Sequence, residues 1–82
     1  MKIPIGTVGR IVRGDRAGQF VRVLDDAANT GGFLVVVSPD PRFRPGAGGD
    51  DWVETKEDLE RYFLECHWMI DWSPDTTVIR TE

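Results

Sequence analysis

One segment of this 82-residue chain has the periodicity of an amphipathic helix, and it constrains the fold more than any other. Four apolar side chains recur at the i, i+3, i+4, i+7 spacing of one helical face; they are Leu59, Tyr62, Phe63 and Cys66. Thr55 precedes them as an N-cap whose hydroxyl can accept from the Asp58 N–H, while the Asp58 side chain reaches back. We therefore predict a single helix over residues 55–66, which must bury its stripe against another element.

The segments around this helix have strand patterns, so the stripe is expected to pack on a sheet. Residues 7–13 and 19–24 are rich in β-forming side chains, and the glycine-bounded turn 14–18 between them predicts a hairpin. Residues 33–38 form a continuous apolar run, which is typical of a central strand covered on both faces. Residues 51–54 are expected to form a short edge strand.

The remaining segments are a last strand, two loops and a tail. Trp68, Ile70 and Trp72 alternate on one face of a strand over residues 68–72. Residues 25–32 are polar and end in glycine, so they are expected to form a loop. Prolines and glycines exclude regular structure from residues 39–49, where Phe43 is expected to anchor the loop to the core. The tail is a loose end or one more edge strand, and spans residues 73–82.

These patterns predict one α+β domain over residues 1–82. Its small antiparallel sheet is expected to be strongly twisted and partly closed, as in SH3-like barrels, with one amphipathic helix packed against it. Aromatic side chains bury large areas, so they should supply much of a core this small. The side chains expected to be buried are Leu59, Phe63, Trp68 and Trp72.

The charge and composition of the chain limit the partners and the location that it can have. The net charge is −4 and the pI about 4.9, which argues against nucleic-acid binding and favours a basic partner. The one cysteine, Cys66, cannot form an internal disulfide. No apolar run is long enough for a signal peptide or a membrane span, so we expect a cytoplasmic location and no membrane partner.

No pattern of catalytic or metal-ligating residues stands out. Cys66 and His67 are adjacent, so on a helix their side chains diverge, and we expect Cys66 in the core and His67 at the helix C-terminus. The glycines at 6, 9, 14 and 18 lack the lysine of a P-loop. We expect no enzyme activity, no metal and no cofactor.

Two features leave alternatives open. The pairs Asp25–Asp26 and Asp50–Asp51 lack the spacing of a calcium loop and are either solvated loops or a partner-facing acidic patch. The first hairpin contains four arginines, which with Phe20 could contact nucleic acid or could pair with nearby aspartates on a solvent face; they are Arg10, Arg13, Arg16 and Arg22.

The chain resembles two protein families. Residues 6–24, with their glycine-flanked turn, resemble the two-strand core of KOW and other SH3-like barrels, although ribosomal relatives of that type are basic and this chain is acidic. That resemblance implies a nucleic-acid or ribosome-associated module. It is the alternative function.

The larger resemblance covers residues 5–72 and leaves the tail outside. The order of motifs is Gly-x-x-Gly-Arg-Ile-Val, then Asp-Asp and Asn-Thr-Gly-Gly-Phe-Leu, then Trp-Val-Glu before Asp-Leu-Glu, and a final Trp-to-Trp strand. This order is similar to that of small cytoplasmic immunity proteins of bacterial polymorphic-toxin and contact-dependent growth inhibition systems. The resemblance implies that the chain binds the C-terminal domain of one cognate toxin, often a nuclease, and neutralises it.

A nuclease has a basic substrate groove, so acidic loops could occupy it and speed the encounter. Trp52 is a candidate aromatic anchor, because tryptophan is enriched among interface hot spots. The expected partner-binding residues are Asp25, Asp26, Asn29, Asp50, Asp51 and Trp52.

Overall fold

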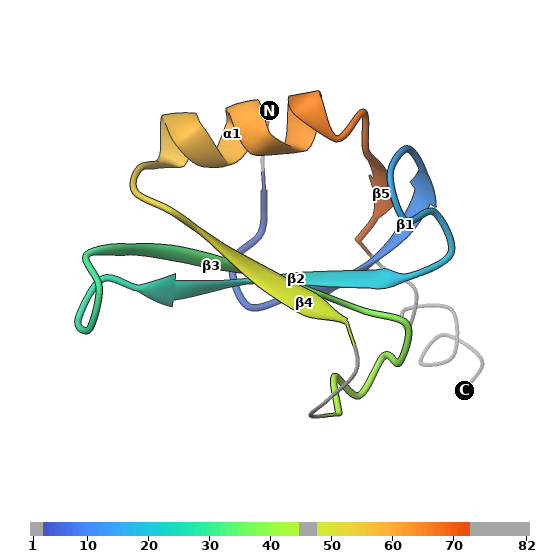
Figure 1. Ribbon diagram of the computed structural model, residues 1–82, viewed down its shortest axis with the longest axis horizontal. Coiled ribbons are helices and arrows are strands. Elements are labelled where there is room, and N and C mark those ends of the chain that lie inside the picture. Colours follow the sequence, from blue (N-terminus) through green and yellow to red (C-terminus); the bar gives the residue numbers. More distant parts are fainter. Residues whose placement is uncertain (1–2, 45–47, 73–82) are drawn as a thin grey trace, which may run out of the picture.

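The computed structural model describes residues 3–44 and 48–72, which form a five-stranded sheet with one helix on it. The elements are β1 (Val8–Arg13), β2 (Phe20–Asp26), β3 (Gly32–Ser38), β4 (Gly49–Val53), α1 (Lys56–Glu65) and β5 (Met69–Asp71). The strand order is β4-β3-β2-β1-β5, and every pair is antiparallel. Figure 1 shows α1 along one face of the sheet, which confirms the α+β prediction.

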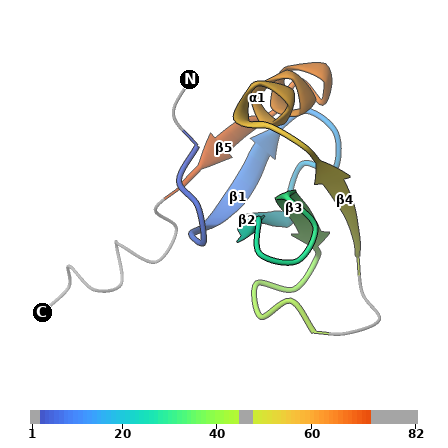
Figure 2. The same ribbon diagram turned by 90° about the vertical axis from the view of Figure 1, so that its left-hand side faces the viewer.

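The sheet is open, so the partial closure expected of an SH3-like barrel is not found. Strands β4 and β5 are its two edges, and they lie on opposite sides of the helix axis in Figure 2. Residues 73–82, which the sequence predicts as a tail or an edge strand, lie outside the described residues. Within the described part of the chain, no helix is long and apolar enough to cross a membrane.

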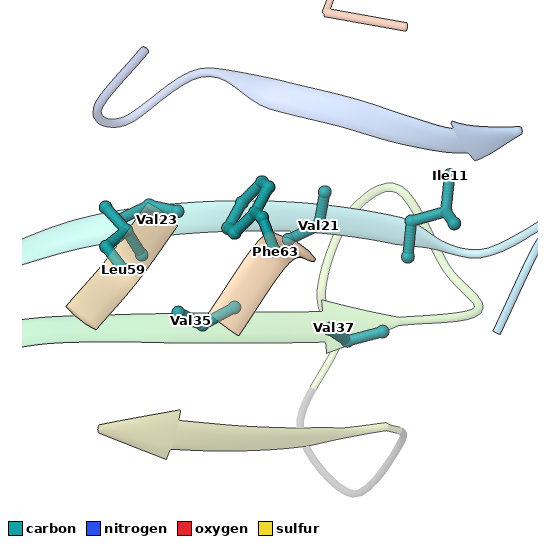
Figure 3. Close-up of a cluster of buried hydrophobic side chains, with 7 residues drawn as sticks. All are labelled: Ile11, Val21, Val23, Val35, Val37, Leu59 and Phe63. Carbon is teal, nitrogen blue, oxygen red and sulfur yellow. The ribbon is translucent and has the colours of Figure 1, made fainter. Parts of the chain in front are cut away.

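The core lies between α1 and the sheet. Alternate residues of β1, β2 and β3 point to the helix, because successive side chains of a strand take opposite faces. The buried cluster consists of Ile11, Val21, Val23, Val35, Val37, Leu59 and Phe63 (Figure 3). Only one face of β3 is fully covered, since Leu34 and Val36 on the other face are half-buried. The prediction of cover on both faces is therefore wrong.

The N-terminus of α1 is capped as the sequence predicts. Thr55 has an extended backbone, and its Oγ1 accepts from the Asp58 N–H at 3.0 Å. The Asp58 carboxylate does not close a reciprocal capping box, because its Oδ1 accepts instead from Arg61 Nη1 at 3.0 Å. Asp58 and Arg61 lie one helical turn apart, where side chains meet.

The C-terminus of α1 ends in a Schellman motif with histidine in the place usually taken by glycine. His67 has φ 57°, and its N–H donates to the Leu64 carbonyl at 3.0 Å. The Trp68 N–H donates to the Phe63 carbonyl at 3.2 Å, and the Trp68 ring packs edge-on against Phe63 at 4.9 Å between centroids. These bonds and this apolar contact are the defining features of the motif, and they turn the chain from α1 into β5.

Of the four residues predicted to be in the core, two are buried and two are half-buried. Leu59 and Phe63 are buried, at 1% and 3% exposed, which confirms the prediction for them. Trp68 and Trp72 are only half-buried, which corrects it. They lie at the rim beside Phe63, and Trp72 occupies the space that a side chain at Gly9 would need.

The end of β2 and the start of β4 also differ from the sequence prediction. Strand β2 continues through Asp25 and Asp26, because the ladder to β3 runs on to the pair Asp26↔Gly32. Asp25 and Asp26 are therefore strand residues, and the turn begins after them. Strand β4 begins at Gly49, where pairing with Val37 starts, which is two residues earlier than expected.

Candidate partner-binding cleft

The six residues predicted to bind a partner fall into two groups. Asp26, Asn29 and Trp52 meet around the hydroxyl of Thr30, at the turn between β2 and β3. Asp50 and Asp51 lie near the start of β4 and line a cleft under α1. Asp25 joins neither group: its Oδ1 accepts from the Ala27 N–H at 3.0 Å. The two acidic pairs therefore do not form one patch.

The first group is a closed network of hydrogen bonds. Asp26 accepts from Asn29 Nδ2 at 3.1 Å and from the Thr30 hydroxyl at 2.9 Å. The Thr30 oxygen in turn accepts from the Trp52 indole N–H at 2.7 Å. Because these groups satisfy one another, they fix the turn, which is the usual use of Asp and Asn at such positions.

Trp52 also has a structural role beside its exposed surface. Its indole ring lies where a side chain at Gly32 would be, with Nε1 and Cε2 2.7 Å from an ideal Cβ there. A ring on an edge strand that covers a glycine of the neighbouring strand stabilises the pairing. The Trp52 side chain is 46% exposed, so about half of it remains accessible to a partner.

The second group belongs to a cleft of about 350 Å³ between α1, β3, β4 and the β1–β2 turn. Val35 and Val37 lie at its base and are 0% and 4% exposed, and the half-buried Tyr62 and Trp68 form an aromatic wall with ring centroids 5.6 Å apart. Its lining residues are Asp15, Arg16, Val35, Val37, Gly49, Asp50, Asp51, Tyr62, Cys66 and Trp68. Of these lining residues, the sequence predicts Asp50 and Asp51 to bind a partner.

Asp51 is held in the cleft by the helix. The Tyr62 hydroxyl donates to Asp51 Oδ2 at 2.5 Å. Burial raises the pKa of the Tyr62 phenol, and the hydrogen bond to Asp51 and its negative charge raise it further. The phenol therefore stays protonated at neutral pH and keeps donating to the carboxylate.

Cys66 lines the cleft instead of joining the core, which corrects the sequence expectation. Burial raises the pKa of its thiol, and the carboxylates of Asp15, Asp51 and Glu65 raise it further. Arg16 acts in the opposite direction and is the smallest of these influences. The thiol is therefore protonated at neutral pH, which makes it a poor nucleophile.

The turn between β1 and β2 forms the remaining wall of the cleft. The Asp15 N–H donates to the Cys66 carbonyl at 3.0 Å, and the Trp68 indole N–H donates to the Asp15 carbonyl at 2.6 Å. Gly14 has φ +99° and lies against the Cys66 and His67 carbonyls. Sequence reasoning identified this segment as a turn but not as part of a site, because its contacts are with residues about 50 positions away.

The arginines of the first hairpin are divided between the two faces of the sheet. Arg16 lines the cleft on the helix side. Arg22 lies on the opposite face, with its guanidinium 4.8 Å from the centre of the Phe43 ring. Phe43 thus contacts Arg22 instead of the core cluster, which corrects its predicted role as a core anchor. Arg10 lies opposite Asp71 in the β1–β5 ladder.

We expect alkaline pH to weaken the fold through Tyr62. The pKa of Tyr62 is higher in the folded protein than in the unfolded chain, where it is about 10. The protonated phenol therefore contributes its full stabilisation below about pH 10, and this contribution is lost as the pH rises further. The Tyr62→Phe variant lacks this group, so its urea midpoint should fall less than that of the unaltered chain between about pH 9 and about pH 11. Parallel midpoint curves for the two proteins would contradict the assignment.

Within the described residues, the cleft is not arranged as a metal site. In residues 3–44 and 48–72, no group of three or more His, Cys, Asp or Glu side chains is arranged to hold a metal ion. The cleft combines a buried apolar base, an aromatic wall and carboxylates.

Comparison of the chain with protein-family models, with curated proteins and with solved structures finds no match.

Proposed function

We propose that this chain is an immunity-type binding protein, which holds one cognate toxin domain in the cytoplasm and neutralises it. Its binding face consists of α1 and the cleft. The observation that carries the proposal is the distribution of charge, which makes this side of the molecule acidic. The order of sequence motifs supports the same function, because it is similar to that of immunity proteins.

The acidity of the chain is concentrated on this face. Asp50 pairs with Val36, which puts its side chain on the opposite face of the sheet. The other lining residues of the cleft and residues 54–65 together contain seven carboxylates and three basic side chains, a net charge of −4, which equals that of the whole chain. The remainder of the sequence is therefore neutral. The carboxylates are Asp15, Asp51, Glu54, Glu57, Asp58, Glu60 and Glu65.

A face of this kind suits a basic partner. Clustered charge of one sign accelerates the encounter with an oppositely charged protein and discourages partners of like charge. The nucleic-acid groove of a nuclease is such a surface, so a nuclease toxin is the partner class that best matches the face. The aromatic wall adds the tyrosine and tryptophan that are enriched among interface hot spots.

The alternative, a nucleic-acid or ribosome-associated module, has less support. Affinity for nucleic acid comes largely from basic side chains gathered on one face. Arg16 and Arg22 lie on opposite faces of the sheet, and Arg16 lines the cleft together with Asp15 and Asp51. Arg10 shares the face of Arg22, so the hairpin arginines are divided between two faces and are not all gathered on one.

Neutralising the acidic face should slow association with the toxin domain. The test is the triple variant Asp15→Asn, Glu57→Gln and Glu65→Gln, titrated against the C-terminal domain of the exoprotein that the proposal expects the neighbouring reading frame to encode. These residues are exposed, and charges at an interface rim act chiefly on the association rate. We expect a several-fold lower rate with a weaker dependence on salt.

The matched control makes the same change in net charge elsewhere. Thr7, Val12 and Ala28 are exposed and lie outside the proposed face, so their replacement by lysine adds three charges away from it. We expect this variant to associate faster than the neutralised one. Equal rates for the two variants would show that net charge alone matters, and would contradict a localised binding face.

A further inference from the structure

We propose that the cleft takes one lysine or arginine side chain of the partner, with the aliphatic stem against the Tyr62 and Trp68 rings and the cationic head beside the carboxylates of Asp15 and Asp51. This inference rests on the proposed function for the identity of the partner, but the chemistry of the cleft can be tested without that partner.

The shape and walls of the cleft match a long amphipathic side chain. Its volume of about 350 Å³ is at the small end of ligand sites, which span about 300–1,000 Å³. Val35 and Val37 at its base are only 0% and 4% exposed, so the accessible apolar surface is that of the half-buried Tyr62 and Trp68 rings, which meet edge to face. Lysine and arginine pack their stems on such surfaces, and their charged heads are attracted to aromatic faces.

The electrostatics of the cleft favour a cation. Among its ten lining residues, Arg16 is the one basic side chain, against the carboxylates of Asp15 and Asp51; Asp50 pairs with Val36, so its side chain points to the opposite face of the sheet. At the Cys66 thiol, each of Asp15, Asp51 and Glu65 acts more strongly than Arg16 does. Asp51 is fixed by its bond from Tyr62, so it is already oriented and the partner need not order it.

Gly49 leaves the cleft open at β4. It pairs with Val37, and cross-strand partners share a face, so a side chain at Gly49 would point to the helix side. An ideal Cβ there meets no atom within 4 Å. Its φ is outside the left-handed region, so leucine at this position fills the cleft without straining the backbone.

The direct test uses blocked amino acids as probes of the whole chain. We expect Nα-acetyl-arginine methylamide and its lysine counterpart to shift the backbone amide resonances of Gly49, Asp51 and Cys66 saturably. The uncharged norleucine counterpart should not. Gly49→Leu should abolish the shifts, and Asp51→Asn should weaken binding several-fold while Asn still accepts from Tyr62. Equal shifts by norleucine, or shifts that persist in Gly49→Leu, would overturn the proposal.

The same variants separate this inference from the proposed function. If both hold, Gly49→Leu should weaken binding of the toxin domain by about tenfold or more, because a buried anchor is lost. Full affinity of a folded Gly49→Leu protein for that domain would overturn the cleft proposal and leave the function standing. Saturable probe binding without any affinity for the domain would support the cleft and contradict the function. Should Gly49→Leu not fold, Asp51→Asn with the probes decides the question.

Discussion

Replacing Phe63 by alanine should remove most of the stability of this protein. Phe63 is 3% exposed and packs against Trp68 and Trp72, so its removal leaves a cavity below α1. Phe-to-Ala changes in cores cost about 3–5 kcal/mol, and a chain of this size has a free energy of unfolding near the low end of about 5–15 kcal/mol. Chemical denaturation followed by tryptophan fluorescence measures the loss.

The neighbouring residue provides the control. Leu64 is also a large apolar side chain of α1, but it is 62% exposed. Leu64→Ala should change the free energy of unfolding by no more than about 0.5 kcal/mol, since alanine is a good helix former and little packing is lost. Similar losses in the two variants would mean that the stripe is not the core contact of α1.

The second large effect is expected at Gly14, which fits the β1–β2 turn against the end of α1. An alanine Cβ there would lie 2.3 Å from the His67 carbonyl oxygen and 2.6 Å from that of Cys66, and φ is +99°. The left-handed conformation costs about 1–2 kcal/mol and overpacking a further 1–3 kcal/mol. Gly14→Ala should therefore destabilise the fold by about 2–5 kcal/mol.

A substitution at Gly18 separates the cost of the left-handed conformation from the cost of overpacking. It has φ +96° in the same turn, but a Cβ there meets nothing within 4 Å. Gly18→Ala should thus cost about 1–2 kcal/mol, the conformational part alone. Urea denaturation of both variants gives the comparison. A Gly14→Ala loss no larger than that of Gly18→Ala would show that the turn does not press on the helix end.

The sequence predicts the local elements of this fold because local signals specify them. The stripe from Leu59 to Phe63 and the cap at Thr55 predict α1, and alternating or continuous apolar runs predict the strands. The end of β2 is different. Asp25 and Asp26 have turn propensity, but the ladder with β3 extends the strand through them. Tertiary pairing outweighs local preference there.

The site is less predictable than the fold, because it depends on contacts between distant parts of the chain. Asp51 meets Tyr62 across 11 positions, and Asp15 meets Trp68 across 53. One sequence signal could have helped: Tyr62 lies within an apolar stripe, and a phenol there needs a polar partner. Nothing in the spacing of Asp26, Asn29 and Trp52 indicates that Thr30 joins them in one network.

We propose that the acidic face formed by α1 and the cleft binds a basic protein domain. Calorimetric titration of the purified chain against the C-terminal domain encoded by the neighbouring reading frame, and against generic RNA, tests it most directly. We expect saturable one-to-one binding of that domain, weakened by salt, and no binding of RNA. Salt-sensitive binding of RNA, with no affinity for the protein domain, would contradict the claim and favour the nucleic-acid module.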